Sequence, residues 1–216
     1  MQDTGPFPRL SIWHLICWTA CSCYLASRSS AQPNLELVLF LMINGGALYA
    51  FGVVAHTCIR RSVWTQTHSG HWFAAVYAWS HVESVAFPSY KALLPFYNLS
   101  CIAFLGMATI YIVAIFVTRL EWYWKLTLLL HAVDSLTAAA WRLLQELGWQ
   151  DVSNLTRSYV QPIAGGAAVL VIVVSIGADF WGKRFRDWLH WIGITWILLQ
   201  WYVFTRVYLV PHFFPK

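Results

Sequence analysis

Within one apolar stretch, residues 122–144, three of the ionisable side chains have spacings that place them on one side of a helix. His131 and Asp134 are one helical turn apart, so a hydrogen bond between them would fix the imidazole tautomer and stabilise an imidazolium ion. Arg142 follows about two turns later, where a guanidinium could hold an anionic headgroup or a carboxylate bidentately. These side chains would suit a proton relay, an anion site or half of a metal site.

The helix that must position these groups has a polar side and an apolar side. At about 100° per residue, an arc of roughly 100° contains Thr127, His131, Asp134, Ser135, Ala138 and Arg142. The opposite side consists of Leu129, Leu130, Val133, Leu136, Ala140 and Leu143. An ionisable group near a bilayer centre costs roughly 3 kcal/mol unless it meets a partner, so the polar side should face other helices. The alternative to a site is a polar seam that fixes helix packing, with Arg142 reaching the membrane interface.

Residues 71–87 carry a second ionisable pair, His81 and Glu83. Because they are two residues apart, an unbroken helix points them about 200° apart and cannot aim both at one site. Glu83 is a candidate functional carboxylate, and its structural alternative is a contact to His131 or Arg142 on a neighbouring helix. The predicted ligand-binding cluster consists of His131, Asp134, Arg142, Glu83 and His81.

Metal and haem sites have weaker patterns. His14, Cys17 and Cys21 share one helix face and could bind Cu(I) or Zn(II), although small cysteines along a packing seam explain the same spacing. Two axial haem ligands could come from the histidines in or near apolar runs, which are His14, His56, His81, His131 and His190. We predict no resident cofactor, and haem or a metal is the alternative.

Motifs of known enzymes are absent: there is no H-E-x-x-H, G-x-S-x-G, P-loop or C-x-x-C pattern. The sequence therefore favours a binding or transport-like protein, or a scaffold subunit whose polar seam is structural, over an enzyme. A membrane enzyme or redox protein is the competing class. It would use His131 and His81 as metal or haem ligands, or His131 and Glu83 as acid and base.

Composition indicates a membrane protein. Of 216 residues, 59% are hydrophobic and 11% are charged, whereas a soluble domain carries about 25% charged residues. The net charge of +5 comes from basic residues that stand singly or in small groups between apolar runs, so we predict no nucleic-acid partner. Most of the five cysteines lie inside hydrophobic runs and are better explained by packing than by disulfides.

The apolar stretches define the predicted architecture, an all-α polytopic integral membrane helix bundle of six or seven transmembrane helices in a single domain, residues 1–216. The first stretch also has features of a signal peptide, so the number of spans depends on whether it is retained. We predict an exposed loop over residues 145–158, and close approach of a neighbouring helix at Asn44-Gly45-Gly46. The candidate spans are residues 11–27, 35–57, 71–87, 96–118, 122–144, 159–181 and 188–210.

Orientation and environment follow from the basic clusters and from one resemblance. Arg60-Arg61 and Lys183–Arg186 fall on the same side of the predicted bundle, which favours an N-terminus inside the cell. The segment RLSIWHLICWTA, residues 9–20, resembles a short N-terminal membrane segment of bacterial predicted membrane proteins of unknown function, and Gly70-His71-Trp72 resembles the same group. The resemblance implies a bacterial cytoplasmic membrane with the first segment retained, and it transfers no activity. The lipid bilayer is the expected partner, with a homo-oligomer or a membrane complex left open.

Overall fold

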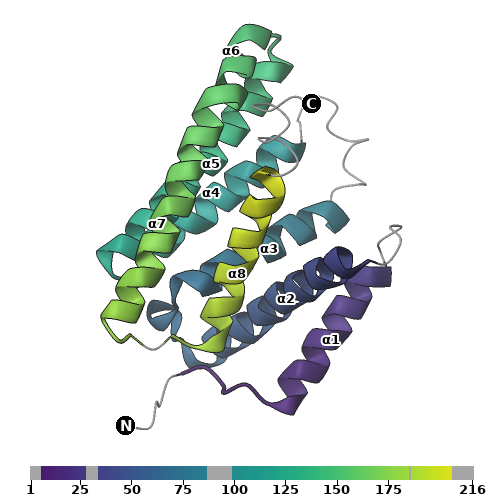
Figure 1. The fold of residues 1–216 in the computed structure, drawn as a ribbon, viewed down its shortest axis with the longest axis vertical. Coiled ribbons are helices and arrows are strands. Elements are labelled where there is room, and N and C mark those ends of the chain that lie inside the picture. Colours follow the sequence, from purple (N-terminus) through teal and green to yellow (C-terminus); the bar gives the residue numbers. More distant parts are fainter. Residues whose placement is uncertain (1–5, 28–33, 87–98, 185, 206–216) are drawn as a thin grey trace. The chain divides into compact units, whose positions relative to one another are not determined.

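The computed structural model describes residues 6–27, 34–86, 99–184 and 186–205, and the regular structure within them is entirely helical. The prediction of an all-α fold is therefore confirmed. Figure 1 shows the helices, labelled α1 to α8. The chain divides into two compact units, described separately below: unit 1 comprises residues 1–78 and 185–216, and unit 2 comprises residues 79–184.

Unit 1 contains α1 (Ile12–Ser27), α2 (Leu35–Arg61), the short 3₁₀ helix η1 (Trp64–Gln66), the first part of α3 (Ser69–Ala86) and α8 (Trp188–Phe204). In it α1 packs against α2, and α2 packs against α8. The Asn34 side chain accepts a hydrogen bond from the Leu37 N–H at 2.7 Å and so caps the start of α2. The helix ends at Ser62, whose φ of 51° is left-handed and whose N–H donates to the Cys58 carbonyl.

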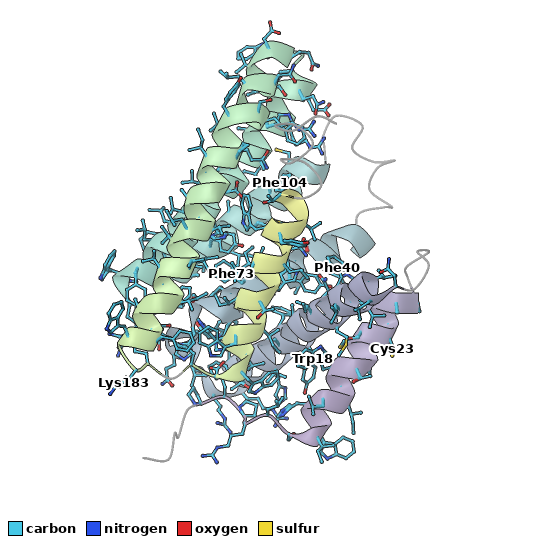
Figure 2. The ribbon with its side chains drawn as sticks, in the orientation of Figure 1. Trp18, Cys23, Phe40, Phe73, Phe104 and Lys183 are labelled. Atoms are coloured by element: carbon cyan, nitrogen blue, oxygen red, sulfur yellow. The ribbon has the colours of Figure 1, made fainter. Side chains whose placement is uncertain are left out.

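The predicted close approach at Asn44-Gly45-Gly46 is present, and the neighbour is α1. A Cβ on Gly45 would overlap Ser22, and a Cβ on Gly46 would lie 2.7 Å from the Trp18 ring. Trp18 (Figure 2) donates from its indole nitrogen to the Met42 carbonyl at 2.6 Å. The two glycines thus let an indole ring lie directly on the backbone of α2.

Helices α3 and α8 meet with almost no side chain between them. A Cβ on Gly70 would overlap the His190 carbonyl, and a Cβ on Gly193 would overlap the Gly70 carbonyl. Asn44 of α2 accepts a hydrogen bond from the Trp196 indole at 3.1 Å, which links α2 to α8. The buried core of unit 1 consists of Phe7, Ala50, Val54, Cys58, Ala74 and Leu189.

Unit 2 contains the remainder of α3, α4 (Leu99–Val117), α5 (Trp122–Glu146), α6 (Gln150–Leu155), the π-helical turn η3 (Thr156–Val160) and α7 (Gln161–Trp181). Helix α5 packs against both α4 and α7. Small buried residues on α4, such as Ala103, Ala108 and Ala114, let it approach α5 closely.

Helix α6, η3 and α7 form one continuous helix over Gln150–Trp181, visible in Figure 1 as the long green element. The prediction of an exposed loop over residues 145–158 is therefore wrong, because helix resumes at Gln150 after a short turn in which Gly148 has a φ of 79°. Pro162 lies inside this helix and has no N–H to donate. The helix accommodates it with the π turn just before, where the Gln161 N–H bonds to the Thr156 carbonyl five residues back.

Two described helices are long and apolar enough to cross a membrane, Leu37–Arg61 and Gln150–Trp181, and Cys101–Val117 is a shorter apolar helix. Helix α5 is long enough to span a membrane, but it is not apolar enough to be one of these two helices. This differs from the prediction of a span over residues 122–144. Lys125, His131 and Asp134 lower its mean hydropathy. All seven predicted apolar stretches coincide with helices over their described residues, apart from Ser11 and Thr118 at the ends of two of them.

Candidate functional site

Helix α5 buries the side that the sequence predicts and exposes the other. Thr127, His131 and Ser135 are buried, and so are the neighbouring Ala132, Ala138 and Ala139. The large aliphatic residues of the opposite side are exposed, and these are Leu129, Val133, Leu136 and Leu143. A 3.6-residue period therefore assigns the faces of α5 correctly, because the amphipathic pattern follows directly from helix geometry.

His131 lies at the centre of the buried side, with 2% of its surface exposed. Its Nδ1 is 2.9 Å from the Thr127 carbonyl, and this contact assigns the Nδ1 proton to the imidazole. The ring of Tyr111 on α4 lies 5.7 Å from the His131 ring, between centroids. His131 is thus held between α5 and α4 in a fixed tautomer.

Asp134 is one turn away from His131 on the same helix. Its Oδ1 is buried and has no hydrogen-bond partner among the described residues, so the predicted bond to His131 does not form through that oxygen. A buried acceptor without a partner costs roughly 1–3 kcal/mol, and in a native fold it calls for an explanation such as a bound ion, water or ligand.

Arg142 does not share a site with Asp134. Eight residues separate them, which is about 12 Å along a helix with a 1.5 Å rise per residue. The Arg142 guanidinium lies over the Trp141 ring at 4.1 Å from the centroid, and its Nε is buried without a partner among the described residues. Arg157 of η3 lies over the same ring at 5.0 Å. The predicted cluster therefore divides into two places on α5, one around Asp134 and one around Trp141.

The start of α5 carries a third polar group, whose hydrogen bonds join it to α7. Asp179 is 1% exposed and accepts from the Tyr123 hydroxyl at 2.7 Å and from the Trp124 indole at 3.0 Å. The hydroxyls of Thr127 and Ser175 lie 3.0 Å apart in the same interface. Asp179 is not among the predicted site residues, although an aspartate near the end of an apolar helix is a recognisable signal.

The other two predicted cluster residues lie on α3 within unit 2. His81 is partly buried. Glu83 lies on the helical backbone of α3, but its side chain is outside the described residues. Their participation in a site with α5 stays a prediction.

Unit 1 contains a hydrogen-bonded group that the sequence analysis missed, at the first turns of α3 and α8. We call it the histidine–aspartate network, and it comprises His68, His71, Arg186, Asp187 and His190. His71 accepts at Nδ1 from the His68 N–H at 3.1 Å, so Nε2 carries the proton and donates to Asp187 Oδ1 at 2.8 Å. Arg186 donates to His68 Nδ1 at 3.1 Å, and His68 Nε2 lies 3.8 Å from Asp187 Oδ2.

Asp187 also caps α8, since its Oδ1 accepts from the His190 N–H at 2.9 Å. In return, His190 Nδ1 accepts from the Gly70 N–H in the first turn of α3 at 3.2 Å. The start of α8 therefore supplies both acceptors: Asp187 satisfies an N–H group of the first turn of α8, and His190 satisfies one of the first turn of α3. The arrangement fastens two helix starts together, and it also places a carboxylate–imidazole pair of the kind used in acid–base chemistry.

The electrostatics of this network favour a charged Asp187. Partial burial opposes the charge, but the hydrogen bond and electrostatic attraction of His71, the hydrogen bond of the His190 amide and the electrostatic attraction of His68 outweigh it and lower the Asp187 pKa to about 2. The N-terminal segment covers the same region. The Phe7 ring meets the His71 ring edge-on at 4.4 Å, and the Pro6 and Pro8 carbonyls accept hydrogen bonds from Arg61 and Trp188.

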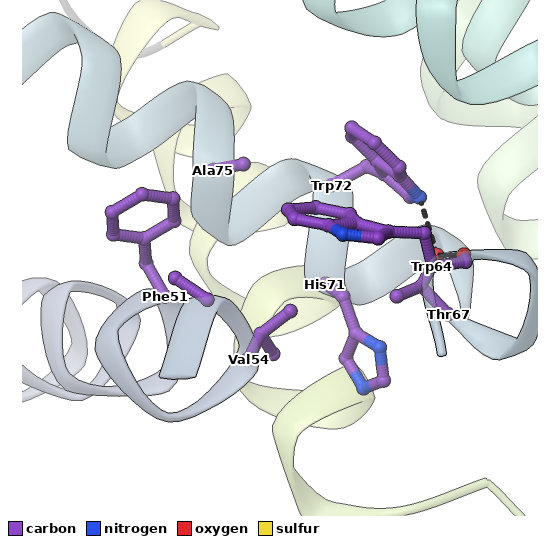
Figure 3. A pocket seen from close by; sticks show the side chains of 8 residues that line it. Phe51, Val54, Trp64, Thr67, His71, Trp72 and Ala75 are labelled. Atoms are coloured by element: carbon purple, nitrogen blue, oxygen red, sulfur yellow. Dashed lines mark hydrogen bonds between the residues drawn. The ribbon is translucent and has the colours of Figure 1, made fainter. Parts of the chain in front are cut away.

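A small apolar pocket of about 20 Å³ adjoins His71 (Figure 3), room for about one water molecule. Trp64 and Trp72 line one part of it, and Phe51 and Val54 of α2 line another. The Trp72 indole donates to the Thr67 hydroxyl at 2.9 Å, so these two polar groups of the pocket lining are already hydrogen-bonded to each other. This pocket has the size of a packing defect and not of a ligand site.

Metal ligation has no support in the described residues, where no three His, Cys, Asp or Glu side chains are grouped so as to hold a metal ion. This includes the weak candidates on α1: His14 Nδ1 is bonded to Ser11, and Cys17 is exposed. The haem alternative stays an untested prediction.

No family model, curated protein or solved structure matches this chain. Within the described residues, the fold defines only a coarse class, an all-helical protein in which two helices are long and apolar enough to cross a membrane.

Proposed function

We propose that the chain is a multi-pass integral membrane protein that binds a small ligand, ion or lipid headgroup at the polar side of α5. Support for the membrane setting comes from the exposed side chains, which are large and apolar along the helices of both units. Those exposed on α7 include Ile163, Leu170, Val173, Val174, Phe180 and Trp181. Surfaces of this kind are unusual on soluble monomers and are the normal lipid-facing surface of a membrane helix.

The observation that carries the ligand proposal is that two buried atoms of α5, Asp134 Oδ1 and Arg142 Nε, have no hydrogen-bond partner among the described residues. Asp134 Oδ1 is an acceptor, so its missing partner is a cation or a hydrogen-bond donor. Arg142 Nε is a donor, so its missing partner is an anion or an acceptor. A seam that served packing alone would gain stability by pairing such groups within the protein.

The orientation belongs to the same proposal. We place the protein in a bacterial cytoplasmic membrane with the N-terminus inside, because Arg60-Arg61 and Lys183–Arg186 then lie on the cytoplasmic side of alternating spans. Alkaline carbonate extraction of membranes tests the setting. The protein should remain in the pellet, and release into the supernatant would overturn the membrane proposal.

The ligand proposal is tested by comparing the wild type with Asp134→Asn, purified as full chains in detergent. Thermal unfolding is measured in chloride salts of sodium, potassium and magnesium, with choline chloride as the control salt. We expect at least one inorganic cation to raise the unfolding midpoint of the wild type and to leave that of Asp134→Asn unchanged. If the substitution lowers the midpoint equally in every salt, the polar side of α5 is a packing seam and the ligand proposal fails at this residue.

A further inference from the structure

We infer that Arg142 and Arg157 form a binding site for the phosphate group of a membrane lipid, with Trp141 as its floor. This inference rests on the proposed membrane setting and names the ligand class at one end of α5. Both guanidinium groups lie over one indole ring, at 4.1 and 5.0 Å from its centroid. The two positive charges are therefore no more than about 9 Å apart, a separation at which like charges repel.

The attraction of each guanidinium group to the Trp141 ring offsets part of this repulsion. No ion pair within 4.0 Å joins either arginine to a carboxylate in the described part of the chain, and the buried Arg142 Nε has no acceptor there. The carboxylates of this end, Glu146 and Asp151, are exposed. By contrast, Arg184 at the other end of α5 pairs with Glu121. Two guanidinium groups on one indole ring, with no ion pair to a carboxylate within 4.0 Å in the described part of the chain, match the forked donors that bind phosphate oxygens.

The backbone around Arg157 also departs from regular helix. Arg157 lies in the π turn η3, which places its side chain differently from a continuous α-helix. Ser153, one turn earlier, is buried, and its hydroxyl lies 3.4 Å from the Trp141 carbonyl, so α6 is fastened to the end of α5. The site is thus made by two segments that the turn at Gly148 brings together.

A lipid is the favoured source of the phosphate because of the surrounding surface. Trp149 and Tyr159 are each 60% exposed, and Leu147 and Leu155 are nearly as exposed. Aromatic and aliphatic side chains beside arginines are typical of the headgroup level of a bilayer, where lipid phosphates are concentrated. Inorganic phosphate would share the same contacts with the arginines but would not need this apolar rim.

The experiment measures thermal unfolding of the purified full chain in mixed micelles. Dioleoyl phosphatidylglycerol supplies the lipid phosphate, dioleoylglycerol lacks it, and inorganic phosphate tests the free anion. With phosphatidylglycerol well above its dissociation constant, we expect the wild-type midpoint to rise by about 5 °C or more, and dioleoylglycerol to have no effect. Protection by inorganic phosphate of equal size would overturn the lipid source and leave the phosphate site standing.

Three variants test whether the two arginines cause the protection by phosphatidylglycerol. Arg142→Gln and Arg157→Gln should each lose most of the protection, whereas Arg119→Gln, which removes an exposed arginine before α5, should keep it. Arg157 is exposed, so its variant folds even if Arg142→Gln does not. Full protection in Arg157→Gln, or none in the wild type, would overturn the inference. The membrane proposal fails separately, through carbonate extraction, and the Asp134 proposal through its own salt series.

Discussion

His71 Nε2 lies 2.8 Å from Asp187 Oδ1, and this hydrogen bond joins the first turn of α3 to the N-cap of α8. The two residues are more than a hundred positions apart in the chain. Asp187 thereby performs two tasks, since the same oxygen caps α8 through the His190 N–H.

Replacing Asp187 with asparagine tests the charge separately from the cap, because asparagine is an equally good N-cap residue. With its pKa lowered to about 2 in the folded state, Asp187 stabilises the fold fully above its unfolded pKa near 4. This contribution disappears as the pH falls through 2. We expect Asp187→Asn to cost roughly 2 kcal/mol near neutral pH and to approach the wild type between pH 4 and 2. Unfolding followed by tryptophan fluorescence measures it, and a pH-independent difference would contradict the assignment.

The glycine contact between α3 and α8 gives a second prediction. A methyl group at Gly70 would overlap the His190 carbonyl, which is backbone and cannot rotate away. Gly70→Ala should therefore cost about 3 kcal/mol or more, at the upper end of the overpacking range. Gly52→Ala is the matched control, because Gly52 lies on α2 of the same unit with nothing within 4 Å of its Cβ position. That variant should be neutral or more stable by roughly 0.5–1 kcal/mol. Equal effects of the two substitutions on the unfolding midpoint would contradict the close contact.

The sequence predicted the positions and the buried faces of the helices better than it predicted which side chains of different helices contact each other. Apolar runs locate the helices, and the 3.6-residue period places His131 on the buried side of α5, because both properties are local. The histidine–aspartate network was missed because its members come from residues 68–71 and 186–190, and no local pattern states that two helix starts will meet. Asp187, directly before the apolar run that starts at residue 188, is an N-cap signal that can be recognised in the sequence.

The separation of Arg142 from Asp134, which the sequence places in one cluster, could also be predicted only in part. The sequence spacing places Arg142 on the same face as Asp134, but a shared face is not a shared site when about 12 Å of helix rise separates two residues. Arg157 was assigned to a polar loop, and its position over Trp141 depends on α6 folding back along α5. The π turn that carries Arg157 follows from Pro162, whose effect on a continuous helix requires knowing that the helix starts at Gln150.

Asp179 offers a test of hydrogen bonding against charge. Its carboxylate accepts from Tyr123 and Trp124 and is buried between α5 and α7. Asparagine keeps an oxygen for the Trp124 indole and offers its amide to the Tyr123 hydroxyl, which can accept. We expect Asp179→Asn to cost about 1 kcal/mol and Asp179→Leu about 3 kcal/mol, since leucine leaves both donors buried without an acceptor. Loss of comparable stability in both variants would show that the negative charge itself, and not hydrogen bonding, holds the two helices.

Pro162 provides the last prediction, because it couples the shape of the long helix to the arginine pair. Pro162→Ala restores an N–H inside a continuous helix, which removes the reason for the π turn at η3. A return to α-helical register rotates the preceding segment by up to about 100° and moves Arg157 away from the Trp141 ring. The variant should therefore be more stable than the wild type in detergent alone, while phosphatidylglycerol should protect it less. Gly177→Ala on the same helix, with open space at its Cβ position, raises helix propensity without changing the register and should keep the lipid protection. If Pro162→Ala keeps it as well, the π turn does not position Arg157, and the arginine pair forms independently of this local irregularity.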